Sequence, residues 1–485
     1  MKSSIKRNLL YQSFYEIVII ILPLLTSPYI SRVLGAENLG IFSYTYSIAY
    51  YFQLLGMLGI KFYGNRKIAQ VRDDQKKLDS TYSELLTIHI IMGMIACAVY
   101  IIYIIFIAGK YKTFSIIQGL MVIATLFDVS WFFFGIENFK LNVIRNAIIK
   151  IVSVVCIFLF VQKKDDLWEY VMIMATSQAT GECIMFFSVS KYAKFRFPAW
   201  NQLGQHIKPL LVLFIPVIST SLFKYMDKIM LGSIGTKTEL GLYDNAEKIL
   251  NIPLSIILAF GSVMMPRMSN LIAKDDIKTC NSYMQLSIKY MLCIAIAMSA
   301  GMAGIASTFA PIFWGKEFER SAQLIKLLAL TLPFSTVANI IRNQDLIPNN
   351  KDQQYTYSII IGASANLLTN WILIPGLQAY GVCVGTVVAE IIVCLVQFKF
   401  ANQEVGYKKY IIDSIWFIIP GILMYWIVLK IGDIMGVHIY TLITQICVGV
   451  GLYSVISGIH LIRVRDKEVI EIIKKIKGVR NNETN

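Results

Sequence analysis

Two groups of charged residues lie inside apolar stretches, where an ionisable side chain is costly. The first is in the run from Asp128 to Lys150, which joins two apolar segments through the polar turn 137–140. If both segments are membrane helices, a rise of about 1.5 Å per residue places both charges roughly 12–15 Å deep on neighbouring helices. An ionisable group at that depth costs at least ~2.5 kcal/mol and marks a candidate site facing a partner or a wet cavity. The alternative is an Asp128–Lys150 ion pair that locks the hairpin.

The second group lies on one predicted helix. Four polar residues recur there at helical spacing on one face: Thr220, Lys224, Asp227 and Lys228. The next predicted helix adds charges near its outer end: Asp244, Glu247 and Lys248. Two interpretations stay open, namely an ion-pair network that closes the outer side of the protein, and lysines that receive an anionic headgroup in a water-filled cavity.

Other polar residues in apolar segments are weaker candidates. Arg145 and Arg267 offer cations near the inner surface, although both could simply extend to the interface. Six carboxylates are candidates for cation coupling or for ion pairs: Glu16, Asp128, Glu182, Asp227, Glu247 and Glu390. One aromatic and amide stripe suits stacking against a sugar, although interfacial belts and ordinary packing give the same pattern: Tyr46, Tyr50 and Gln53.

The composition identifies the elements that must position these residues. Of 485 residues, 56% are hydrophobic and 15% are charged, with a mean hydropathy of +0.61. A soluble chain of this length is far more polar, so we predict an all-α polytopic membrane protein. The apolar runs divide into about fourteen transmembrane helices between residues 10 and 461, and no soluble domain interrupts them.

The net charge of +15 comes from the loops and does not indicate a nucleic-acid partner. Roughly thirty Lys and Arg fall in one alternating set of loops and about nine in the other, which predicts that both termini are cytoplasmic. The basic N-terminus leads into a long apolar segment without a small-residue cleavage site, so we expect a retained first span.

The sequence contains no recognisable catalytic or cofactor motif. Walker A, G-x-S-x-G and H-E-x-x-H patterns are missing, and the eight cysteines and four histidines show no metal-ligand spacing. We therefore expect neither an enzyme nor a resident cofactor or metal. The only coupling ion that we consider is Na⁺ or H⁺, whose gradient would act through the buried carboxylates.

Short motifs recur in the two halves of the chain. G-A-E-N-L-G-I-F-S-Y (residues 35–44) returns as G-T-K-T-E-L-G-L-Y (residues 235–243), and Pro23 has a counterpart in Pro216. These repeats predict two parallel six-helix bundles, residues 1–200 and 201–405, around a central cavity, an architecture of transporters that rock one half against the other. Two additional transmembrane helices follow at 406–462. We predict that residues 463–485 form a basic amphipathic tail suited to the anionic cytoplasmic leaflet.

The ordered set of motifs along nearly the whole chain resembles one family. The motifs are Y-G-N-R-K-I-A (63–69), D-V-S-W-F-F-F-G-I-E-N-F-K (128–140), M-D-K-I-M-L-G (226–232), E-L-G-L-Y-D-N-A-E-K (239–248), M-P-R-M-S (265–269) and the run from Asn366 to Glu390. They resemble the bacterial polysaccharide flippases, the O-antigen and capsule repeat-unit transporters of the multidrug/oligosaccharidyl-lipid/polysaccharide exporter superfamily.

This resemblance implies transport of an undecaprenyl-pyrophosphate-linked oligosaccharide from the inner to the outer leaflet of the bacterial cytoplasmic membrane. It also implies membrane lipid, a polysaccharide polymerase and a chain-length regulator as partners. Lys150, Lys224 and Lys228 are the expected cations of the cavity by location. Related peptidoglycan-precursor flippases carry several arginines in the first two helices, whereas this chain has only Arg32 there. A cation-coupled multidrug antiporter of the same superfamily and a non-transporting scaffold are the alternatives.

Overall fold

The computed structural model describes the backbone of residues 2–402 and 405–464, and their side chains except for 2–21, 139–140 and 223. Every regular element in these ranges is helical. Within the described residues, eleven stretches are long and apolar enough to cross a membrane. The two arms of the first helix and one further helix, residues 167–189, complete the predicted fourteen, and the all-α polytopic class is confirmed.

Nine helices make up the first part of the chain: α1 (Lys2–Met57), α2 (Ile60–Val71), α3 (Gln75–Phe106), α4 (Lys112–Ala124), α5 (Ser130–Gly135), α6 (Phe139–Phe160), α7 (Leu167–Val189), α8 (Trp200–Ser221) and α9 (Asp227–Ile234). Short turns join some of them: η1 (Gly109–Tyr111), η2 (Thr125–Phe127) and the π-turn η3 (Leu222–Met226). Helix α1 is divided at Gly35, whose φ of 76° favours glycine, and this break separates the first two predicted spans.

Nine more helices complete the described chain: α10 (Lys237–Ala273), α11 (Ile277–Trp314), α12 (Ser321–Ala329), α13 (Thr331–Ile341), α14 (Asp352–Leu377), α15 (Ala379–Phe400), α16 (Tyr407–Ile415), α17 (Ile418–Met435) and α18 (Ile439–Arg463). A 3₁₀ turn, η4 (Lys316–Phe318), and a π-turn, η5 (Arg342–Leu346), interrupt the sequence of α-helices. The predicted amphipathic tail lies, beyond Val464, outside the described residues.

The chain divides into two compact units. Unit 1 comprises Met1–Asp244 and Leu367–Val382, and unit 2 comprises Asn245–Asn366 and Cys383–Asn485. These limits pass through α10, α14 and α15 and follow packing rather than sequence repeats. The predicted bundle boundaries near residues 200 and 405 remain a prediction.

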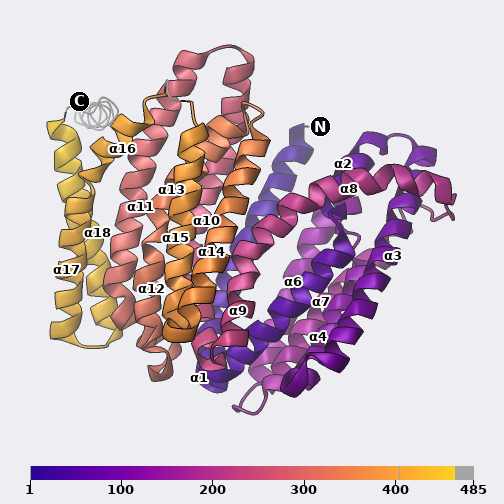
Figure 1. Cartoon of the computed structure of the whole chain (residues 1–485), viewed down its shortest axis with the longest axis horizontal. Helices are drawn as coiled ribbons and strands as arrows, with labels where there is room; N and C mark the ends of the chain where they lie inside the picture. Colours follow the sequence, from indigo (N-terminus) through magenta and orange to yellow (C-terminus); the bar gives the residue numbers. More distant parts are fainter. Residues whose placement is uncertain (1, 403–404, 465–485) are drawn as a thin grey trace, which may run out of the picture. The chain divides into compact units, whose positions relative to one another are not determined.

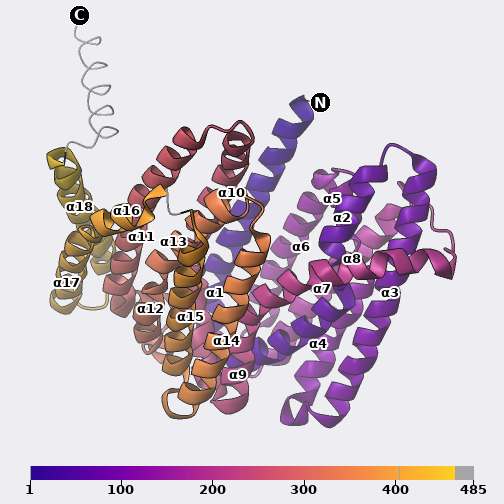
Figure 2. The same cartoon turned by 45° about the horizontal axis from the view of Figure 1, so that its top comes forward.

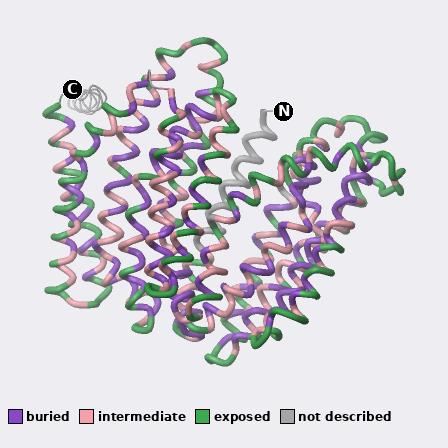
Figure 3. The backbone as a smooth tube through the Cα atoms, in the orientation of Figure 1, coloured by how far each residue is buried: buried purple, intermediate pink, exposed green. Residues whose placement is uncertain are grey.

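The core of unit 1 is built around the aromatic run of α5. Trp131, Phe132 and Phe133 are fully buried, and the ring of Phe132 lies edge-on to Tyr82 of α3. Helix α2 approaches α5 closely because Gly64, which faces the Trp131 ring, has no side chain. A Cβ added at Gly64 would lie 2.6 Å from a carbon of that ring. The two motifs 63–69 and 128–140 are therefore parts of one packing unit, and Figure 3 shows the buried segments of these helices.

A buried polar network attaches α8 to this core. The Tyr63 hydroxyl lies 2.8 Å from His206 Nδ1, and His206 Nε2 lies 2.8 Å from the Glu84 carboxylate. All three side chains are buried, so each polar atom needs the partner it has. Pro209 and Pro216 lie inside α8 and account for its curved course in Figures 1 and 2.

In unit 2 the last two helices pack on α11. The Tyr453 hydroxyl of α18 donates to the Cys293 carbonyl of α11 over 2.7 Å, and Val428 of α17 lies against Gly304 and Gly449. Small residues at these contacts let the helix backbones approach, as is usual between membrane helices. Figure 1 shows α17 and α18 side by side.

Candidate functional site

Asp128 lies at a break within a predicted span. The chain leaves helical geometry at Asp128 and Val129, between η2 and α5, where the sequence alone predicts one continuous helix. The Asp128 carboxylate accepts the Ser130 N–H over 2.9 Å, and the buried His89 side chain contacts the Thr125 carbonyl over 2.7 Å. These side chains satisfy backbone groups that the break releases, which is a requirement inside a membrane.

Arg145 is not an interfacial cation. Its guanidinium is buried, lies 3.5 Å from the Glu182 carboxylate and donates to the Gly181 carbonyl and to Asn142. This arrangement joins α6 to α7 through charge-assisted hydrogen bonds. The geometry makes Arg145 and Glu182 one ion pair of unit 1, whereas the sequence offered them as separate candidates.

Lys150 is half-buried midway along α6. Among the described side chains, no ion pair within 4.0 Å joins it to Asp128, whose carboxylate caps α5 instead. The Asp128–Lys150 ion pair that the sequence offered as an alternative is therefore not formed. The role of Lys150 toward a substrate remains a prediction.

The four polar residues of the seventh predicted span do not share one environment. Thr220 and Lys224 are exposed, Asp227 is buried and Lys228 is half-buried. The prediction of a single polar face was wrong because the π-turn η3 interrupts the 3.6-residue period just before Asp227. Pi-turns of this kind often mark functional sites because they display side chains that a regular helix would hide.

Lys228 and Asp244 form a buried ion pair in unit 1. Lys228 Nζ lies 2.6 Å from Asp244 Oδ1, and the two side chains are only 13% and 8% exposed. The Ser43 hydroxyl of α1 donates to the same oxygen over 2.9 Å. Next to this pair, Asp227 accepts hydrogen bonds from Asn370 and Tyr243, at 2.6 and 3.2 Å. The ion-pair interpretation of the sequence therefore fits Lys228 and Asp244, whereas Asp227 is held by hydrogen bonds from neutral side chains.

Lys224 is different from its neighbours. It projects from η3, is exposed, and forms no hydrogen bond or ion pair within the described part of the chain. Lys224 directly follows the candidate span Trp200–Ser221 and lies within the span that the sequence predicts, where such a cation requires water or an anionic ligand. Of the lysines predicted for the site, Lys224 is thus the one whose geometry best suits an incoming anion.

An aromatic cluster lies beside these lysines. Tyr50 of α1 stacks on Tyr225 of η3 with ring centroids 3.9 Å apart, and Tyr46 lies 6.4 Å from Tyr50. Lys228 Nζ lies 6.0 Å from the Tyr225 ring. Gln53 is buried and accepts from Gln178 over 3.2 Å, so it supports the helices rather than the cluster. Sequence reasoning missed Tyr225, although its position between Lys224 and Lys228 was visible.

The two repeat motifs pack against each other at the predicted outer end of unit 1. A Cβ at Gly40 would overlap the Lys237 carbonyl oxygen, and a Cβ at Gly241 would overlap the Ala36 carbonyl oxygen. The contact is reciprocal between equivalent positions of the repeat. Lys237 donates to the Gly232 carbonyl, with its ammonium 3.9 Å from the Tyr44 ring centroid. The repeat found in the sequence thus corresponds to a close contact between two helix starts.

Three of the remaining candidates belong to unit 2. Arg267, in unit 2, is exposed at the end of α10 and stacks over the Tyr283 ring, 4.2 Å from its centroid. Glu390 accepts from the Ser335 hydroxyl over 2.8 Å, and Glu247 is half-buried on α10. The Glu16 side chain lies outside the described residues. Within the described part, no group of His, Cys, Asp or Glu side chains could hold a metal ion.

A double-mutant cycle tests the role of Lys228. We expect Lys228→Met to lower the free energy of unfolding by about 3–5 kcal/mol, because Asp244 would remain buried as an unpaired carboxylate. Lys228→Met combined with Asp244→Asn should recover most of that loss. Thermal unfolding of the purified variants measures both effects, and a Lys228→Met variant as stable as the wild type would contradict the structural role.

Taken together, the many apolar helices and the ion pairs between them define a polytopic membrane protein. Residues 5–272, more than half of the chain, match the family model described as polysaccharide biosynthesis protein, and the chain belongs to that family. Membership in a family of transporters confirms that the protein is not an enzyme.

Comparisons with individual proteins agree with this family. The chain is 21% identical over 397 residues to a candidate O-antigen transporter of Shigella dysenteriae, covering 81% of this chain and 99% of that protein. Its fold is similar to the lipid II flippase MurJ in an inward closed conformation, with a TM-score of 0.74 at 16% identity, over 94% and 99% of the two chains. An inward-facing multidrug resistance MATE transporter has a TM-score of 0.58 at 13% identity, over 81% and 99%.

Proposed function

We propose that this protein is a flippase that moves an undecaprenyl-pyrophosphate-linked oligosaccharide from the inner to the outer leaflet of the bacterial cytoplasmic membrane. The observation that carries the proposal is the exposed Lys224 on a π-turn that directly follows a candidate membrane span, next to the stacked Tyr50 and Tyr225. The family match and the similarity to a candidate O-antigen transporter support the same substrate class.

The chemistry of the cluster suits the two parts of such a headgroup. A pyrophosphate is a compact anion, and a lysine ammonium offers it charge and hydrogen-bond donors inside the span. A sugar ring presents C–H groups that pack on an aromatic face such as that of Tyr225. Because the polyprenyl tail is apolar, it remains in lipid while only the headgroup needs this polar route.

The membrane potential can drive the export direction. With about 100 mV negative inside, outward movement of two negative charges is favourable by roughly 4–5 kcal/mol. Charge that moves with the protein would reduce that value. Coupling to Na⁺ or H⁺ through buried carboxylates is therefore compatible with the proposal but not required by it.

The proposal includes the topology that the sequence predicts. Both termini face the cytoplasm, and alternating access proceeds by rocking of one half of the protein against the other. The exported unit would then reach a polysaccharide polymerase and a chain-length regulator, with O-antigen or capsule as the product.

Deletion of the gene tests the function in cells. We expect surface polysaccharide to disappear and the lipid-linked repeat unit to accumulate on the cytoplasmic side, with both effects reversed by the wild-type gene. Unchanged surface polysaccharide together with new sensitivity to cationic dyes would instead assign the protein to the multidrug antiporters.

A further inference from the structure

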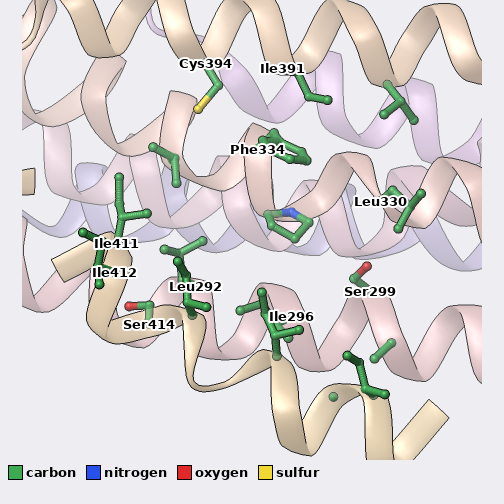
Figure 4. Close-up of a pocket in the computed structure, with 18 of the residues that line it drawn as sticks. Leu292, Ile296, Ser299, Leu330, Phe334, Ile391, Cys394, Ile411, Ile412 and Ser414 are labelled. Carbon is green, nitrogen blue, oxygen red and sulfur yellow. The ribbon is translucent and has the colours of Figure 1, made fainter. Parts of the chain in front are cut away.

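Unit 2 contains a long apolar groove that the proposed function does not use. The groove lies between α11, the α12–α13 segment, α15 and the α16–α17 segment, and it encloses about 920 Å³. Figure 4 shows Ile391 and Cys394 of α15 and Phe334 of α13 facing Leu292 and Ile296 of α11 across it.

Apart from two lysines, the half-buried Lys326 of α12 and Lys408 of α16, the wall of the groove offers almost no polar contact. Ser299 of α11 donates to the Ala329 carbonyl of α12, and Ser414 donates to the Tyr410 carbonyl of its own helix, each over 2.7 Å, so both hydroxyls already have partners within the protein. Several large apolar side chains in the wall are nonetheless exposed, among them Phe334 at 36% and Ile412 at 54%. A space of this size and polarity in a membrane protein is occupied by hydrocarbon chains, because water there would lack hydrogen-bond partners.

The mouth of the groove carries a cation. Lys408, in the first turn of α16, lines the groove, is exposed, and has no hydrogen bond or ion pair among the described residues. Helix α16 is held in place beside it, because Tyr407 donates to Asp345 over 3.2 Å and Tyr410 donates to Gln285 over 2.9 Å. The predicted topology puts this end of the groove at the cytoplasmic leaflet, where anionic lipid headgroups lie.

We propose that this groove is a binding site for a resident anionic phospholipid, with its acyl chains along α11 and α15 and its phosphate at Lys408. Basic positions at the cytoplasmic ends of grooves between membrane helices are typical of such sites. A resident lipid suits the groove better than the tail of a transported lipid, because a phosphate held at Lys408 stays in one leaflet.

The chain offers a matched control for the charge. Lys409 neighbours Lys408 in the same turn and is equally exposed, but it does not line the groove. With the full-length protein in mild detergent, native mass spectrometry measures binding of phosphatidylglycerol and of phosphatidylethanolamine with identical acyl chains. We expect the wild type to prefer phosphatidylglycerol and Lys408→Ala to bind it about five-fold more weakly, whereas Lys409→Ala should match the wild type. Equal effects of the two substitutions would overturn the proposal.

A second variant tests the groove itself. Ala300 lines the groove, and Ala300→Trp should fill it and remove binding of both phospholipids. Leu423 on α17 is lipid-facing but lies outside the groove, so Leu423→Trp should leave binding unchanged. Retained lipid in Ala300→Trp would contradict the site.

The identity of the occupant is tested by competition. Added polyprenyl diphosphate should leave bound phosphatidylglycerol in place, and one-for-one displacement would assign the groove to the tail of the transported lipid and overturn the proposal. Because the readout is lipid binding, the result does not depend on whether the protein moves an oligosaccharide.

Discussion

Replacing Lys224 with alanine is expected to stop most export of surface polysaccharide without loss of protein from the membrane. Lys224 is exposed on the π-turn and stabilises no neighbour within the described residues, so its removal should not affect folding. A hydrogen-bonded contact between a cation and a phosphate contributes about 1.5–3 kcal/mol, so export should slow by roughly 10- to 150-fold. Surface polysaccharide measured at matched protein levels gives the result.

Two variants separate charge from other effects at this position. Thr220 lies one turn earlier, is exposed and neutral, and its hydroxyl bonds only to its own helix, so Thr220→Ala should export normally. Lys224→Arg keeps the charge and should retain most export. Normal export by Lys224→Ala would remove this lysine from the site.

Replacing Gly241 with alanine is expected to destabilise the fold through a backbone overlap. The new Cβ would overlap the Ala36 carbonyl oxygen, and because that atom belongs to the backbone, no side-chain rotation relieves the overlap. The two helix starts must then separate, at a cost of about 1–3 kcal/mol or more. Thermal unfolding of the purified variant, and its yield in the membrane, measure the loss.

The repeat predicts an equal effect at the equivalent position. Gly40→Ala would overlap the Lys237 carbonyl oxygen and should destabilise the protein as much as Gly241→Ala does. Gly458 on α18 has nothing within 4 Å of an added Cβ, so Gly458→Ala is the matched control and should be neutral or slightly stabilising. Wild-type stability of both Gly40→Ala and Gly241→Ala would contradict the close contact.

The helices were predictable because hydrophobic length is a strong signal. A membrane helix must satisfy its backbone internally and stay apolar over about twenty residues, so fourteen spans could be placed from the sequence. The repeat was also visible, since glycines that permit close backbone contact recur at Gly40 and Gly241. Its physical meaning, a contact between the two copies, became visible only in the folded structure.

The site was less predictable because it depends on departures from regular helices. The π-turn η3 changes the register between Lys224 and Asp227, and the break at Asp128 directs that carboxylate to a backbone N–H. The ion pairs were equally hard to predict from the sequence, because spacing along the chain does not show that Arg145 contacts Glu182 on another helix. Lysines that look alike in the sequence therefore differ in the structure, with Lys228 in an ion pair and Lys224 exposed.

Translocation by the purified protein is the most direct test of the account. Proteoliposomes that contain a polyprenyl-diphosphate-linked oligosaccharide would be assayed for sugar that becomes accessible to an external glycosidase, with an imposed membrane potential. We predict that the wild type exposes the sugar well above protein-free liposomes, and that Lys224→Ala at equal protein content is at least about ten-fold slower. Wild-type rates no faster than protein-free liposomes, or equal rates for the wild type and Lys224→Ala, would contradict it.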